Sequence, residues 1–214
     1  MEKKRMKEWM KRHTAAALIF ALALTGAGLF CVSWLGRGSG RLQEGIAGKM
    51  IRFHVLGNSD SQEDQQLKLQ VKDGLVEYLK PMLSGAKNVD ETREILQEHT
   101  VDIQQKAREL IAQEGYPYGA TAELTTCYFP IKTYGDCTFP AGNYEALRVK
   151  IGAAEGKNWW CVLYPNLCFI DTLHGIVPEE QKQELQHVLT EEEYDSLFQE
   201  QKIKFKFWIW DRDF

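Results

Sequence analysis

The chain has 214 residues, 44% of them hydrophobic, and a net charge of -4. Its first 13 residues hold six bases and two acids, so the remaining 201 residues carry a net charge of -8. An acidic surface repels nucleic acids and anionic lipids, and this balance excludes both as expected partners of the larger part. The length beyond residue 36 suits one domain with a substantial hydrophobic core.

An uncharged segment, residues 14–35, follows the basic tail of residues 1–13. Twenty-two residues rising about 1.5 Å each can cross a hydrocarbon core of roughly 30 Å, and basic residues before such a segment stay in the cytoplasm. This pattern predicts one N-terminal transmembrane helix, either a retained signal-anchor or a signal peptide cleaved near residues 25–27. Residues 36–49 are then a linker that contains GRGSG, and residues 50–214 form an extracytoplasmic domain.

The first half of this domain shows one strand pattern and two helix patterns. Residues 50–58 alternate apolar and polar side chains, which predicts a half-buried strand. Ser61 with Asp64 resembles a helix cap, and helical spacing of apolar residues continues until Pro81. Asn88 with Glu91 predicts the start of a second helix, which we expect to end at Gly115.

The second half is richer in strand patterns. We predict strands at residues 121–129, 144–151 and 158–164, short helices at 178–189 and 190–201, and a last strand at 202–210. Strands and helices are segregated in the sequence. The fold class expected is therefore α+β, a single domain with a largely antiparallel sheet and several helices, preceded by the transmembrane helix.

Four of the five cysteines lie in the expected extracytoplasmic domain: Cys127, Cys137, Cys161 and Cys168. Even-numbered, clustered cysteines beyond a membrane segment are typical of disulfides. Of the three possible pairings we favour Cys127–Cys137 and Cys161–Cys168, because turn residues lie between the members of each pair. A zinc site is the rival, but short paired-cysteine spacings are absent.

Few residues suggest enzyme chemistry. His54, Asp171 and His174 are weak hydrolase candidates, because His174 follows Asp171 by three residues and His54 lies on a predicted strand. No nucleophile elbow, HExxH helix, calcium loop or P-loop accompanies them. We therefore predict no catalytic residues, no metal, no cofactor and no small-molecule substrate.

Two long blocks, IRFHVLGNSDSQEDQQLKLQVKDGLVEYL and TYGDCTFPAGNYEALRVKIGAAEGKNWWCVLYPNLCFID, are followed by HGIVP. In this order, behind a membrane segment, they resemble the stage II sporulation protein R family of endospore-forming bacteria. The resemblance implies a signalling protein that is made in the forespore. It would be exported into the intermembrane space of the septum, where it activates a membrane-embedded aspartic protease of the mother cell. That protease cleaves the pro-sigma-E precursor. A cell-envelope hydrolase acting in the same compartment is the alternative.

A partner of this kind needs a binding surface on the exported domain. Rigid aromatic side chains dominate binding hot spots, which favours the segment from Tyr134 to Asp171 as the surface that meets the protease. Trp159 and Trp160 are adjacent on a predicted strand, so they should point to opposite faces, one buried and one available. The candidate surface residues are Phe139, Tyr144, Trp159, Trp160 and Tyr164.

Overall fold

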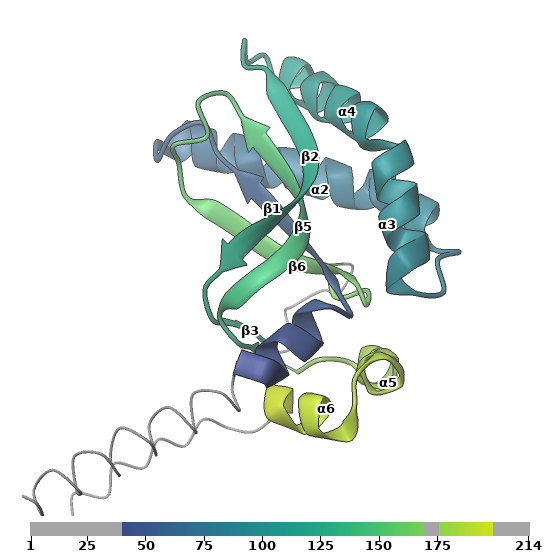
Figure 1. Ribbon diagram of the computed structural model, residues 1–214. Helices are drawn as coiled ribbons and strands as arrows, with labels where there is room; N and C mark the ends of the chain where they lie inside the picture. Colours follow the sequence, from purple (N-terminus) through teal and green to yellow (C-terminus); the bar gives the residue numbers. More distant parts are fainter. Residues whose placement is uncertain (1–39, 169–175, 199–214) are drawn as a thin grey trace, which may run out of the picture. The chain divides into compact units, whose positions relative to one another are not determined.

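A computed structural model describes residues 40–168 and 176–198 (Figure 1). The chain divides into two units, residues 1–44 and 45–214, and all the labelled strands and helices belong to the second. Among the described residues, no helix is both long enough and apolar enough to cross a membrane. The helix predicted at 14–35, the strand predicted at 202–210, and Asp171 and His174 lie outside the described residues.

The folded part of the chain begins before residue 50. Residues 40–47, which were expected to belong to a linker, are helical. Ile46 is fully buried and Met50 nearly so, and both pack into a hydrophobic core. The sequence pattern did not indicate this helix, because the helix is short and begins at the end of GRGSG, a sequence typical of a flexible linker.

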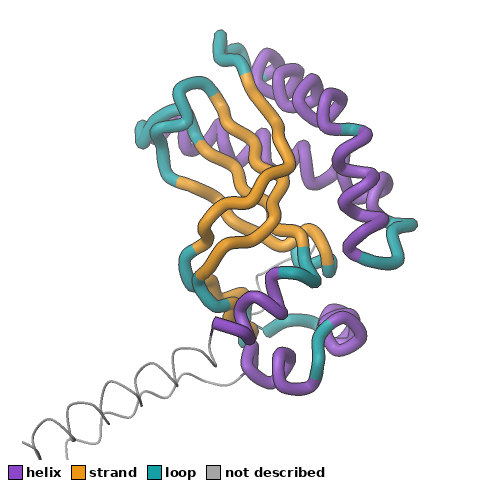
Figure 2. Tube along the Cα trace, viewed as in Figure 1, coloured by secondary structure: helices purple, strands orange, loops and turns teal. Residues whose placement is uncertain are grey.

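The domain is built on a four-stranded sheet with the strand order β2-β5-β1-β6 (Figures 1 and 2). The strands are β1 (Ile51–Leu56), β2 (Ala120–Phe129), β5 (Gly142–Ile151) and β6 (Asn158–Tyr164). β2 pairs with β5 and β6 pairs with β1 in antiparallel fashion, whereas β1 and β5 are parallel. The expectation of a largely antiparallel sheet is confirmed.

The helix α2 (Gln62–Leu83) begins where the cap was predicted. The hydroxyl of Ser61 accepts a hydrogen bond from the Asp64 N–H at 3.1 Å. Such a cap satisfies one of the free N–H groups of the first turn. The acidic residues in that turn interact favourably with the positive end of the helix dipole. The helix continues through Pro81 for two residues more than predicted.

The second predicted helix is two helices, α3 (Val89–Glu98) and α4 (Thr100–Gln113). The chain turns at His99, which ends α3 and precedes α4. The Thr100 hydroxyl donates to the Leu96 carbonyl at 2.6 Å, so a local side-chain bond supports the turn. The apolar spacing runs through the turn unchanged, and this is why the sequence indicated one helix.

Side chains bury both faces of the sheet. One core lies between the sheet and α2, α3 and α4, with Phe53, Leu75 and Leu147 among its members. A second core covers the opposite face and contains Phe129 and Val162. The prediction that β1 is half-buried was therefore wrong: its polar residues Arg52 and His54 face the second core and are also buried.

Small elements complete this second core. β3 (Lys132–Tyr134) and β4 (Cys137–Phe139) form a short antiparallel hairpin, and α5 (Glu179–Val188) and α6 (Glu191–Phe198) follow the sheet in sequence. Thr190 and Glu193 bond each other's backbone N–H groups at 3.3 and 2.8 Å, which confirms the predicted start of α6. Phe139 of the hairpin, Leu185 of α5 and Leu197 of α6 are fully buried.

Candidate functional site

Two of the five aromatic residues predicted to form a partner surface lie in the interior. Phe139 is fully buried and Tyr144 is 1% exposed. The Tyr144 hydroxyl donates to the Pro140 carbonyl at 2.7 Å, which satisfies it inside the fold. Neither side chain can meet a partner, and the prediction is wrong for both because the small hairpin and α6 cover that face of the sheet.

Trp159 and Trp160 point to opposite faces of β6, as their adjacency requires. Trp159 meets Phe53 edge to face at 5.7 Å in the first core. Trp160 stacks on His54 at 3.8 Å in the second core. Both indoles are half-buried, so the expectation of one buried and one free ring is wrong. The sheet is covered on both sides, and each ring lies at a border of its core.

The buried Arg52 organises the second core. Its guanidinium carbon lies 4.4 Å from the ring centre of Phe129, 5.0 Å from that of Tyr144 and 5.1 Å from that of Phe139. Its Nε donates to the Cys161 carbonyl and its Nη2 to the Tyr134 hydroxyl, both at 3.0 Å. Among the described residues no carboxylate pairs with it, so aromatic faces and neutral oxygens stabilise the charge.

His54 lies beside Cys127, which invites comparison with a nucleophilic pair. The Cys127 Sγ is 3.8 Å from His54 Nδ1. Burial, assisted by Arg148 and Lys150, lowers the pKa of His54 to about 4, and burial raises the pKa of the Cys127 thiol. Both groups are therefore neutral near pH 7. A cysteine nucleophile requires a thiolate, so this arrangement favours a structural role.

All four cysteines of the domain are free thiols in the structure, and neither predicted disulfide is formed there. Cys161 and Cys168 are neighbours: burial, together with a hydrogen bond to Cys161, raises the pKa of the Cys168 thiol. Cys137 is buried in the hairpin, which raises its pKa to about 12. The two pairings stay predictions. The described residues contain no group of three side chains able to hold a metal ion.

Two loops from distant parts of the chain lock together at one end of the sheet. The Asn58 side chain accepts from the Ala153 N–H at 2.8 Å, and Asp60 accepts from the Lys157 N–H at 2.6 Å. A Cβ at Gly156 would lie 2.1 Å from the Ser59 carbonyl oxygen, so only glycine permits this approach. The loops thus hold the start of β6 against the start of α2.

The acidic residues of this loop also have protein partners. The Asp64 carboxylate accepts hydrogen bonds from the Ser59 hydroxyl at 2.6 Å and the Asn58 amide at 2.8 Å. These bonds lower the pKa of Asp64. Asp60 and Asp64 therefore anchor the start of α2 through bonds within the protein.

Tyr164, the last of the predicted surface residues, lines a cavity of about 200 Å³ at the opposite end of β6. Its hydroxyl donates to the Lys87 carbonyl at 3.2 Å, and burial with nearby Glu184 and Glu91 raises its pKa. The cavity combines aromatic, aliphatic and charged groups. Its lining consists of Ala86, Lys87, Tyr164, Pro165, Asn166, Glu184, His187 and Val188.

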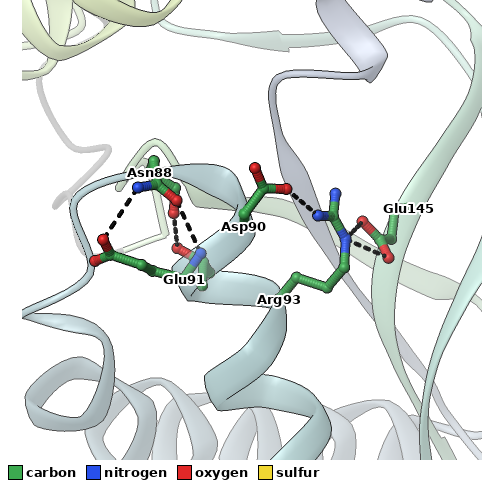
Figure 3. Close-up of polar contacts among 6 residues, drawn as sticks. Asn88, Asp90, Glu91, Arg93 and Glu145 are labelled. Atoms are coloured by element: carbon green, nitrogen blue, oxygen red, sulfur yellow. Dashed lines mark hydrogen bonds and ion pairs between the residues drawn. The ribbon is translucent and has the colours of Figure 1, made fainter.

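Lys87, which lines this cavity, is held by the start of α3. Figure 3 shows the polar contacts at this helix start. The Asn88 side chain accepts from the Glu91 N–H at 2.8 Å, and the Glu91 carboxylate accepts from the Lys87 N–H at 2.9 Å. Arg93 bonds Asp90 and, at 2.8 Å, Glu145 of β5. The loop that carries Lys87 is therefore tied through α3 to the sheet.

Comparison with known proteins identifies the family. Residues 47–174 match the sequence model of the family described as Stage II sporulation protein R. The chain belongs to the stage II sporulation protein R family. It is similar to Stage II sporulation protein R of Bacillus subtilis (strain 168), with 35% identity over 137 residues. The match covers 64% of this chain and 61% of that relative's length. No solved structure matches the chain.

The family match begins at residue 47, close to where the described fold begins, and includes β1 to β6 and the Tyr164 side of the cavity. Sequence reasoning found Tyr164 but missed Lys87, Glu184 and His187, which complete the lining. These residues come from a loop and from α5, separated by about 100 positions, and no local pattern marks them. Arg52 is one of the polar residues of the alternation in β1, and that alternation shows only that the strand has two faces.

Proposed function

We propose that this chain is an extracytoplasmic sporulation signalling protein that activates a membrane-bound aspartic protease, which then processes the pro-sigma-E precursor in the mother cell. The observation that carries the proposal is membership of the stage II sporulation protein R family over residues 47–174. Family membership supports a sporulation role directly. Activation of the protease is the finer step that we propose.

The location belongs to the same proposal. The basic tail and the apolar residues 14–35 support export across a membrane, with the domain on the outer side. In a developing spore, we propose, the domain is made by the forespore and acts in the intermembrane space of the septum, tethered or released there. The domain acts as a ligand and not as an enzyme.

A ligand activates a receptor by binding its active state better than its inactive state. We propose that the surface used is the cavity beside Tyr164. Lys87 and Glu184 give the cavity both signs of charge, which suits a polar and partly aromatic segment of the protease.

The test is co-expression of the full chain with the cognate protease and the pro-sigma-E precursor, followed by blotting for the processed form. Glu184→Arg reverses a charge in the cavity, and we expect processing to fall by about tenfold or more, the effect of losing roughly 1.4 kcal/mol of binding. Glu94→Arg is the matched control: an exposed glutamate on α3 that does not line the cavity.

The two outcomes separate the claims. Loss of processing with Glu184→Arg and normal processing with Glu94→Arg support both the function and the surface. Equal processing in both variants and in the unchanged chain would place the contact elsewhere. No processing with the unchanged chain, although protease and precursor are present, would remove the proposed function itself.

A further inference from the structure

The strand β2 has an open edge over half of its length. Its first half is covered from α4: Arg108 Nε donates to the Ala120 carbonyl at 2.9 Å, and Gln104 accepts from the Ala122 N–H at 3.2 Å. These contacts show that even-numbered residues of β2 turn their backbone groups away from β5. In an antiparallel strand the same holds two and four residues further on.

The remaining outward residues are Leu124, Thr126 and Tyr128. Their outward N–H and carbonyl groups have no hydrogen-bond partner among residues 40–168 and 176–198. Residues 124–129 read LTTCYF and carry no charge, and Tyr128 is 63% exposed. Natural edge strands are normally protected by charges, proline or a cover. This half-edge has none of these, which indicates that another strand pairs with it.

We propose that the C-terminal segment of this same chain, residues 202–210, pairs with Leu124–Tyr128 as an antiparallel fifth strand. The segment reads KIKFKFWIW, and its apolar residues at 203, 205, 207 and 209 alternate with lysines and tryptophans. Lysines alternate with apolar residues over 202–207, which is the pattern of a strand with one apolar face. The inference does not depend on the proposed function.

The described contacts place the end of α6 within reach of the open edge. α6 ends at Phe198, and Lys182 Nζ lies 5.5 Å from the Phe198 ring centre. The same Lys182 bonds Asp136, at the tip of the β3–β4 hairpin, at 2.8 Å. Asp136 is seven residues beyond the end of β2. The last two of these seven, residues 135 and 136, form the hairpin turn, which leaves five residues in the extended part. The extended part spans about 16 Å at roughly 3.3 Å per residue, a distance that residues 199–203 can cover.

The direction and the faces agree with this arrangement. A chain arriving at the Tyr128 end of β2 must run back along it, which makes the pair antiparallel. Even-numbered residues of β2 lie on the face of the first core, and Leu124 packs against that core. The apolar side chains of 203, 205, 207 and 209 then cover Leu124 and Tyr128, while the lysines share the face of Glu123. A slip by one residue would reverse both matches, so this register is specified.

Residue-resolved amide hydrogen exchange of the full chain in detergent micelles tests the pairing. We expect the outward amides of Leu124, Thr126 and Tyr128 to exchange slowly. In the double variant Phe205→Pro/Lys206→Pro they should exchange at least tenfold faster, because two consecutive N–H donors are lost and one of them faces β2 in any register. Arg212→Pro/Asp213→Pro, beyond the alternating run, is the matched control and should leave the protection unchanged.

The inward amides of Thr125 and Cys127, which bond β5, report folding. If they also become fast in the double variant, Phe205→Asp/Phe207→Asp, which retains every N–H donor, replaces it, and the same selective tenfold change is expected. Outward amides that exchange fast in the unchanged chain would overturn the proposal. Protection that survives the double variant but disappears on tenfold dilution would also overturn it, because a second copy would then occupy the edge.

Discussion

The two edges of the sheet are protected to different extents. At β6, the Trp160 carbonyl accepts from the Tyr134 hydroxyl at 3.1 Å, and the Val162 carbonyl accepts from the N–H groups of Leu167 and Cys168 at 3.2 and 3.0 Å. At β2, only the half beside α4 is covered by described residues. The groups that cover β6 are a tyrosine hydroxyl distant in sequence and the turn that follows the strand. The groups that cover β2 are side chains of α4. Tertiary contacts therefore cover the edge at β6 and half of the edge at β2. The uncovered half of β2 still requires a contact of this kind.

The largest expected effect comes from removing Arg52, which supports the closed edge from inside. Arg52→Ala leaves a cavity among four aromatic rings and deprives Tyr134 and the Cys161 carbonyl of a donor. We expect the free energy of unfolding to fall by about 3 kcal/mol or more. Urea denaturation measures it. Arg148→Ala, at the surface of β5, should change it by less than about 1 kcal/mol, and equal losses in the two variants would contradict the role of Arg52.

A second effect concerns pH, because His54 is stacked on Trp160 beneath the closed edge. The pKa of His54 is about 4 in the fold and about 6.5 when unfolded. Between these values the unfolded chain binds more protons, so stability is lost as pH falls from 6.5 to 4, by roughly 2–3 kcal/mol. His54→Gln should flatten this part of the pH profile. If the stability of the variant falls equally steeply with pH, groups other than His54 cause the loss of stability.

Opening the β6 edge alone should have an intermediate effect. Tyr134→Phe keeps the ring in the core but removes the hydroxyl that joins Arg52 Nη2 to the Trp160 carbonyl. Two buried polar groups then lack a partner, and we expect a loss of about 1–3 kcal/mol. Thermal or urea unfolding checks it. Thr133→Val, on the exposed side of the same hairpin strand, is the control and should be close to neutral.

The smallest effect is expected at the covered half of β2. Gln104→Ala removes the acceptor for the Ala122 N–H, which should cost about 1 kcal/mol and increase exchange at that amide. Gln105→Ala removes an exposed side chain whose bond to Glu109 lies on the surface, so it serves as the matched control. If Ala122 exchanges equally fast in both variants, α4 does not cover this edge.

Local patterns were sufficient for the elements that depend on local chemistry. The caps at Ser61, Asn88 and Thr190 and the strands that became β2, β5 and β6 follow from residue types and spacing. The break at His99, the burial of Arg52 and the parallel pairing of β1 with β5 depend on partners far along the chain. For the same reason the cavity could be predicted only through Tyr164, since its other walls come from α5 and the loop before α3.

The most direct measurement of function is the processing of the pro-sigma-E precursor in cells that contain the cognate protease, with and without this chain. We predict that the processed form appears only when the full chain is present, and that it disappears when the aspartates of the protease active site are replaced. Processing of the precursor at the same rate without the chain would contradict the role that we propose for it, that of the activating signal.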